Sequence, residues 1–119
     1  MEIQWLDKPQ KHDYAAAVSY LSLTMDRRAA KALAAELADA AIQTFAAKDI
    51  FRASGLSLLG VSNSHVEKDI AKLKAGEKLS PLLLHRDVLH AKLVIADGYH
   101  RVCAVYRFDE DAMIPCKIV

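Results

Sequence analysis

Cysteine, glycine, proline and aromatic residues are all scarce in this sequence of 119 residues. It has two cysteines, four glycines and three prolines, and aromatic side chains make up 7% of it. Two cysteines, Cys103 and Cys116, do not make a disulfide framework or a cysteine metal cluster in such a chain. We therefore expect both to be small buried hydrophobic residues, and we expect no metal site.

Long apolar runs are also missing. No stretch approaches the ~20 apolar residues that a bilayer-spanning helix needs. The charged N-terminus, MEIQWLDKPQKHD, lacks the apolar segment of a signal peptide. We expect a soluble, cytoplasmic protein with no membrane partner.

The sequence contains no block of one charge sign. Its 16 Lys and Arg residues are interspersed with 15 Asp and Glu residues, which leaves a net charge of +1. This balance creates no strong field toward nucleic acid or an acidic membrane. The pattern argues against duplex DNA binding by this chain alone, and the length fits one domain with one core.

Alanine is the residue in excess, because it fills ten of the nineteen positions from 29 to 47. Asp26 can cap a helix here, and apolar residues recur after it at three- and four-residue spacing. That apolar stripe consists of Ala29, Ala30, Leu33, Leu37, Ala40, Ala41 and Phe45. Since alanine has the highest helix propensity, we predict a helix that continues as far as Phe45.

A shorter helix is predicted over residues 13–24, with Asp13 as its N-cap. Together the two helices would form a helical hairpin, preceded by an irregular arm over residues 1–12 that Trp5 pins to the body. The hairpin has two interpretations. It is either a structural appendage, or it offers residues 13–46 to a second copy or to another protein partner.

We place the sharpest junction of the chain near residue 47. The arm and hairpin then occupy residues 1–47, and a second unit occupies residues 48–119. Residues 48–62 have no helical period and contain two glycines. They are predicted to form a short strand and an extended connection.

The next predicted helix covers residues 65–75, where Ser64 and Glu67 have the spacing of a capping box. Pro115 places the last strand near a sheet edge, or at a position whose N–H is not needed. The other predicted elements are strands over 82–84 and 92–96, a helix over 99–108 and the last strand over 113–119.

The stretch LVIADGYHRVCAVYRF, residues 93–108, joins a strand to a helix through Asp-Gly. The first amides of a helix have no intrahelical partner and the helix dipole adds positive charge there, so the turn is a candidate anion site. Gly98 lets a ligand approach the backbone, and Arg101 can fork onto two phosphate oxygens. Asp97 either caps the helix or turns away to orient a metal, a hydroxyl or His100.

The order of elements around this turn resembles the ParB/sulfiredoxin superfamily. Members of that family end with an apolar strand, a glycine-containing motif such as GxHR that opens a helix, and a strand of the IP-x-x-V type. LVIADGYHRVCAVYRF followed by IPCKIV is similar to this pattern, and DIFRAS with HVEKDIAKLKAGEKLSPLLL is similar to the family's earlier strand, helix and core strand. The resemblance covers about residues 48–119. It implies a small α/β domain with a mixed sheet, which the helical hairpin precedes.

The resemblance also implies a bound nucleotide, with its phosphates over the G-x-H-R turn. The family's preceding helix contributes further phosphate contacts, and Lys68 and Lys72 are the candidates on that helix here. Neither lysine matches a fixed motif, so a solvated helix face is the alternative for both. The implied ligands are ATP, ADP or CTP with magnesium. The implied binding residues are Gly98, Tyr99, His100, Arg101, Lys68 and Lys72.

The sequence departs from the family at two points. Tyr99 occupies the position of the catalytic cysteine of sulfiredoxins, and tyrosine cannot form thiol-derived intermediates, so sulfiredoxin activity is not expected. ParB clamps carry a DNA-binding region after this domain, whereas this chain ends at Val119.

The family also includes kinases of a free amino acid, whose D-G-H-x-R-like turn the Asp97-Gly98 pair resembles.

Three functional hypotheses follow for the turn Asp97-Gly98-Tyr99-His100-Arg101. The first is a binding module for a nucleotide or another phosphate ligand. The second is a phosphotransferase or nucleotide hydrolase in which Asp97 and His100 take part. The third is a non-catalytic interaction or structural protein. An enzyme needs a base near the acceptor, for which Glu67, Asp69 and Asp87 are the candidates, and we favour the binding module because none of these stands out.

Overall fold

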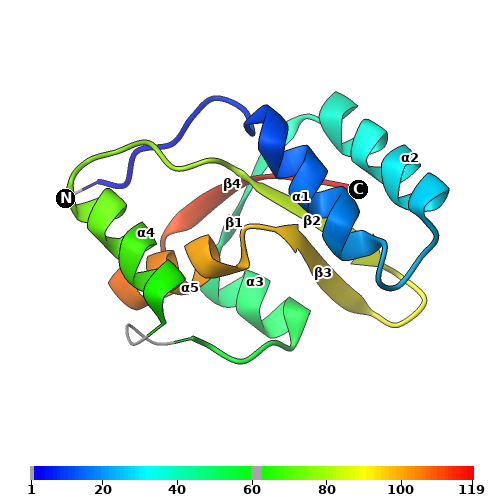
Figure 1. The fold of residues 1–119 in the computed structure, drawn as a ribbon. Coiled ribbons are helices and arrows are strands. Elements are labelled where there is room, and N and C mark those ends of the chain that lie inside the picture. The colour runs from blue at the N-terminus through cyan, green and yellow to red at the C-terminus, as the bar shows by residue number, and fades with distance from the viewer. Residues whose placement is uncertain (1, 60–62) are drawn as a thin grey trace.

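The computed structural model describes residues 2–59 and 63–119. The elements are α1 (Lys11–Leu21), α2 (Arg27–Asp39), β1 (Ile42–Ala46), α3 (Ala47–Ser54), α4 (Ser64–Lys74), β2 (Leu82–Asp87), β3 (Lys92–Asp97), α5 (Tyr99–Phe108) and β4 (Met113–Ile118). They build one compact α/β domain in which a four-stranded mixed sheet has helices on both faces (Figure 1). Among the described residues, no helix is long and apolar enough to cross a membrane.

The strand order in the sheet is β1-β4-β2-β3. The β1–β4 and β2–β3 pairs are antiparallel, and β2 and β4 are parallel. The β2–β3 pair contains an irregularity between Leu83 and Leu84, and Asp97 lies opposite Leu83. The turn that follows Asp97 therefore begins beside the central strand β2, at the end of the edge strand β3.

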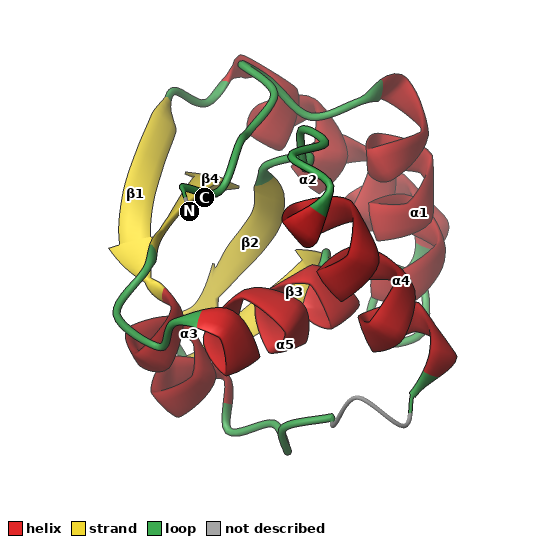
Figure 2. Ribbon diagram, turned by 90° about the vertical axis from the view of Figure 1, so that its left-hand side faces the viewer, coloured by secondary structure: helices red, strands yellow, loops and turns green. Residues whose placement is uncertain are grey.

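The apolar strand β2 is buried on both faces, as the sequence predicts. Leu82 and Leu84 belong to the main core, where the sheet packs against α3 and α5. Leu83 faces the other way, into a second cluster formed with α1 and α2. This alternation is that of a central strand between two helical layers. Figure 2 shows α3, α4 and α5 together on one side of the sheet.

Helix α4 packs on α5 rather than flat on the sheet. Val66 of α4 is buried in a small cluster with Cys103 and Ala104 of α5. Leu73, near the end of α4, reaches the main core. Because α4 and α5 lie side by side, residues on the first turns of both helices can meet at one site.

The sequence prediction was wrong for residues 42–46, which form strand β1 and not the end of a helix. Helix α2 ends at Asp39, and Ala40 is already extended, with φ −71° and ψ 149°. Strand β1 pairs with β4 from Ile42–Lys117 to Ala46–Met113. The backbone hydrogen bonds and side-chain packing of this pair outweigh the local helix propensity of alanine.

The prediction of a strand within residues 48–62 was also wrong, because Ala47–Ser54 is helix α3. Its buried residues Ala47, Ile50 and Ser54 have helical spacing. Gly55 ends the helix in a left-handed conformation with φ 66°. Residues 60–62 of the predicted connection lie outside the described residues.

Two predicted helix starts are corrected. Helix α1 begins at Lys11, with Gln10 as its N-cap and Asp13 three residues into the helix. Helix α4 is capped by Asn63 rather than Ser64, since the Asn63 side chain accepts hydrogen bonds from the N–H groups of His65 and Val66. In both cases an earlier polar residue takes the cap, three positions before Asp13 in α1 and one position before Ser64 in α4.

The predicted edge position of the last strand was wrong, because β4 lies between β1 and β2. The alternative offered for Pro115 agrees with the register. Pairing of β4 with β2 begins only at Cys116, one residue beyond the proline. The predicted anchoring of the arm is confirmed, since Trp5 forms a bridge with Leu79 and the N–H of Leu6 donates to the Leu79 carbonyl at 2.8 Å.

Candidate functional site

The candidate site is built on the junction between β3 and α5. Strand β3 ends at Asp97, Gly98 is left-handed with φ 106°, and α5 begins at Tyr99. Among the described residues, no side chain caps the start of α5. The first α5 amides therefore keep the unpartnered donors that the sequence analysis associates with an anion site.

Gly98 is required at this junction for two reasons. Its positive φ is unfavourable for any residue with a Cβ. A Cβ here would also lie 2.3 Å from Cδ2 of Leu82 and 2.7 Å from Nη2 of Arg101. The Arg101 side chain therefore folds back over Gly98. The sequence did not predict this packing contact between the two residues.

Asp97 does not cap α5, and its partner is Arg101 rather than the metal, hydroxyl or His100 that the sequence suggested. Nη2 of Arg101 donates a 2.8 Å hydrogen bond to Oδ2 of Asp97, so the carboxylate turns away from the helix amides. Burial raises the pKa of Asp97 above its ordinary value, and the charge of Arg101 opposes that rise. Arg101 is itself largely enclosed, with 13% of its side chain exposed.

Asp13 is the second carboxylate beside Arg101, and the sequence analysis predicted only a helix-capping role for it. Its Oδ1 lies 3.8 Å from Nη1 of Arg101, and its Oδ2 accepts hydrogen bonds from the Ser80 hydroxyl and from the N–H of Gln10. Asp13 and Ser80 are both buried. This cluster joins α1 to the β3–α5 junction, so Arg101 has a structural role whatever else it binds.

A polar cavity of about 310 Å³ opens beside this cluster. Of the two lysines proposed for α4, Lys72 lines the cavity and Lys68 does not, although both are exposed. Its described lining residues are Gln10, His12, Asp13, Ala16, Asp69, Lys72, Lys78, Leu79, Ser80, Asp97, Gly98, Tyr99, His100 and Arg101. The structure thus gathers Gly98, His100, Arg101 and Lys72 around one cavity and leaves Lys68 outside it.

His100 lies against His65 of α4, with ring centroids 4.8 Å apart. Burial lowers the pKa of His100 below its ordinary value of 6.5, and the neighbouring His65 lowers it further. His100 is therefore mainly neutral near pH 7, and one ring nitrogen can accept a proton. Sequence reasoning missed His65, since only the packing of α4 on α5 brings the two rings together.

Asp69 is the one of the three candidate bases that lines the polar cavity. Burial raises the pKa of its carboxyl group above the ordinary value, while Arg101 and Lys72 oppose the rise. Asp87 lines a different cavity, and Glu67 is exposed on α4. Within the described residues, no group of three or more His, Cys, Asp or Glu side chains could hold a metal ion.

Tyr99 points toward the α3–α4 connection, where its hydroxyl donates a hydrogen bond to the Ser57 carbonyl. Cys103 lies one turn further along α5 and is buried, as is Cys116 on β4, which confirms the sequence expectation for both. Burial raises the pKa of the Cys103 thiol and raises that of Cys116 to about 12. Neither sulfur is an activated thiolate at neutral pH.

A second, more apolar cavity of about 450 Å³ adjoins the first at the same turn. The two cavities share Ala16 and residues 97–100 as lining. The second adds the aromatic ring of Tyr20 and the apolar side chains of Leu56 and Ile95. The same turn is thus bordered by one polar and one mainly apolar cavity.

Comparison with known proteins gave no match to a family model, to a curated protein or to a solved structure. The ParB/sulfiredoxin resemblance therefore depends on the quoted motifs and on the order of the elements.

Proposed function

We propose that this chain is a binding domain for a phosphate-containing ligand, most specifically a nucleotide, at the Asp97–Arg101 turn. The observation that carries the proposal is the uncapped start of α5 beside a polar cavity that Lys72 and His100 also line. Unpartnered amides, a helix dipole and a lysine are the groups that commonly bind phosphate oxygens.

The formal charges of the cavity lining balance, with Asp13, Asp69 and Asp97 against Lys72, Lys78 and Arg101. Arg101 pairs with both Asp13 and Asp97, and the Asp97 carboxylate does not compete for the α5 amides. The attraction for an anion therefore comes from the uncapped amides and from Lys72 and Lys78, whose side chains are exposed. The adjoining apolar cavity with Tyr20 favours a nucleotide over inorganic phosphate, because it offers room for a base.

The ParB/sulfiredoxin-like assignment belongs to the same proposal. The order α4, β2, β3, α5, β4 is the one that the resemblance implies for the second half of the chain. One departure weakens the match, since the segment DIFRAS lies in helix α3 and not in an opening strand. The hairpin α1–α2 covers one face of the sheet in addition to that pattern.

Thermal shifts test the proposal, with ATP, ADP, CTP, GTP and inorganic phosphate each added with and without magnesium. A ligand at about 100 times its Kd adds about 2.7 kcal/mol to the free energy of unfolding. That increment raises Tm by several degrees for a domain of this size. Lys72→Ala should reduce the shift, while the matched variant Lys68→Ala should retain it. No shift with any of these ligands at millimolar concentration would refute the proposal.

Phosphoryl transfer at the same site is a second candidate, which the position of Asp69 favours. Its carboxyl group lines the cavity with His100, and its raised pKa suits a general base better than an ordinary surface aspartate does. Asp69→Asn should then preserve the nucleotide-dependent thermal shift and abolish product formation. A nucleotide that binds and is recovered unchanged, with candidate hydroxyl acceptors present, supports the binding module instead.

A further inference from the structure

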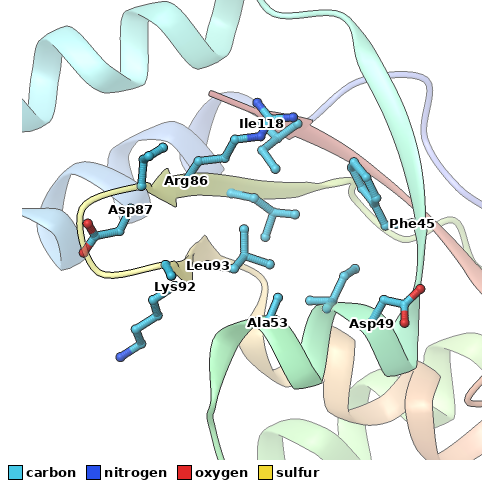
Figure 3. Close-up of a pocket in the computed structure, with 12 residues that line it drawn as sticks. Phe45, Asp49, Ala53, Arg86, Asp87, Lys92, Leu93 and Ile118 are labelled. Carbon is cyan, nitrogen blue, oxygen red and sulfur yellow. The ribbon is translucent and has the colours of Figure 1, made fainter.

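A third cavity, of about 360 Å³, lies at the opposite end of strands β2 and β3 from the Asp97–Arg101 turn and shares none of its described lining residues with the candidate site. Helix α3, the end of β4 and the β2–β3 hairpin enclose it (Figure 3). Its walls are the apolar side chains of Phe45, Ile50, Leu84, Leu93 and Ile118. All of these belong to or pack on the main core, so the cavity opens directly onto that core.

The tip of the β2–β3 hairpin, residues 88–91, carries two aliphatic side chains that reach none of this core. Val88 is 81% exposed and Leu89 is 88% exposed. Turn tips are normally polar, and single exposed aliphatic residues are common, but an adjacent pair beside an apolar cavity forms a continuous patch. The same face of the molecule thus has an apolar projection and an apolar depression.

The hairpin tip is held in a fixed conformation. The Asp87 carboxylate accepts hydrogen bonds from the backbone N–H of His90, at 3.2 Å, and pairs with the His90 ring at 2.8 Å. The N–H of Ala91 donates to the Val88 carbonyl at 3.2 Å, and Ala91 itself is left-handed with φ 51°. A rigid tip loses little conformational entropy when a partner covers it.

The rim of the cavity carries charges of both signs. Arg86 and Lys92 lie on the hairpin, where neither forms an ion pair within the described part of the chain, and Asp87 beside them pairs with His90. Asp49 lies across the cavity on α3, as Figure 3 shows, and forms an exposed ion pair with Arg52 of the same helix at 3.4 Å. If the hairpin of one molecule entered the cavity of another, its two unpaired basic side chains could compete with Arg52 for Asp49, since an exposed ion pair contributes little stability.

We propose that this face binds a second copy of the chain about a two-fold axis. In this dimer, Leu89 of each copy enters the cavity of the other, and Arg86 and Lys92 approach the opposing Asp49. A surface that carries both the projection and the depression is self-complementary, as a two-fold interface requires. This interface is independent of the proposed nucleotide site and differs from the α1–α2 surface that the sequence suggested.

Sedimentation velocity from micromolar to millimolar concentration tests the dimer. The wild-type chain should associate reversibly, and Leu89→Asp should raise the dissociation constant by about tenfold or more. Leu23→Asp is the matched control, because Leu23 is 80% exposed but lies in the α1–α2 connection. A monomer throughout the range, or a dimer that Leu89→Asp leaves intact, would overturn the proposal.

A charge exchange identifies the partner surfaces. Asp49→Lys and Lys92→Glu should each weaken self-association, because each places like charges opposite one another across both halves of the interface. An equimolar mixture of the two variants should associate more tightly than either alone, since the mixed dimer has one native pair and one reversed pair. A mixture that associates no better than the single variants would show that these groups do not meet.

Discussion

Oδ2 of Asp97 accepts a 2.8 Å hydrogen bond from Nη2 of Arg101, one helical turn further along the chain. This contact keeps the carboxylate away from the first amides of α5, which no described side chain caps. It also encloses the guanidinium that sequence reasoning assigned to a phosphate. The contribution of Arg101 to a ligand site is therefore inseparable from its contribution to stability.

Arg101→Ala should lower the free energy of unfolding by about 3 kcal/mol, because it leaves Asp97 and the buried Asp13 without their cationic partner. Arg107→Ala, at an exposed position of the same helix, should change it by no more than about 0.5 kcal/mol. Urea unfolding followed by circular dichroism measures both. Equal, small losses in the two variants would show that the buried cluster does not depend on Arg101.

Gly98→Ala should also destabilise the fold, by about 3 kcal/mol, since a Cβ at φ 106° would lie 2.3 Å from Cδ2 of Leu82. Gly76→Ala separates the two causes. Gly76 also has a positive φ, 75°, but a Cβ there meets no described atom within 4 Å, so a loss of only about 1 kcal/mol is expected. The same unfolding measurement compares them, and a Gly98→Ala protein as stable as Gly76→Ala would contradict the close packing.

Asp69→Asn should make the domain more stable near neutral pH. Burial raises the pKa of Asp69 above its ordinary value of 3.8, so the folded state holds this proton more tightly than the unfolded state does. The free energy of unfolding contributed by Asp69 therefore falls as pH rises from about 3.8 through the folded-state pKa. Asparagine does not ionise, so Asp69→Asn removes this pH-dependent loss of stability.

Thermal unfolding across pH measures the Asp69 effect. The advantage of Asp69→Asn should be greatest near pH 7 and should vanish as pH approaches 3.8. Glu67→Gln is the control, because Glu67 is exposed on the same helix. A pH-independent difference between Asp69→Asn and the wild type would mean that titration of this carboxyl group is not its cause.

Asn63→Ala should cost about 1 kcal/mol, because the Asn63 side chain caps α4 through the N–H groups of His65 and Val66. Ser64→Ala should cost little, since Ser64 is the first residue of the helix and not its cap. The comparison is made by chemical denaturation of both variants. A larger loss of stability in Ser64→Ala than in Asn63→Ala would contradict this and support the Ser64–Glu67 capping box predicted from the sequence.

The sequence predicted the elements whose type is decided locally. The strands at 82–84 and 92–96 are short apolar runs whose length and flanking turn residues favour a strand, and the helix at 99–108 follows the Asp-Gly turn with apolar residues at helical spacing. Residues 42–46 and 47–54 were assigned the wrong type for a physical reason. Alanine favours a helix locally, but β1 exists because β4 provides a pairing partner from a distant part of the chain, as in the Gln43–Cys116 pair.

The candidate site was predictable only where its residues are adjacent in sequence. The Asp97–Arg101 motif identified the junction, and the family resemblance suggested Lys72 together with Lys68, of which only Lys72 lines the cavity. Asp13 and Ser80 come from distant segments, and no pattern in the sequence links either of them to Arg101. His65 lies one turn from Asp69 on α4, so the helical face that carries both could have suggested it once α4 was known to pack on α5.

A phosphate ligand bound at the start of α5 should contact the uncapped amides of that helix. An ¹H–¹⁵N NMR titration of the backbone amides, with the nucleotide that gives the largest thermal shift, measures this contact. The Tyr99, His100 and Arg101 amides should show saturable shifts, which Lys72→Ala weakens and Lys68→Ala does not. Amides at this turn that stay unchanged while the nucleotide binds elsewhere, or do not respond to any nucleotide, would contradict it.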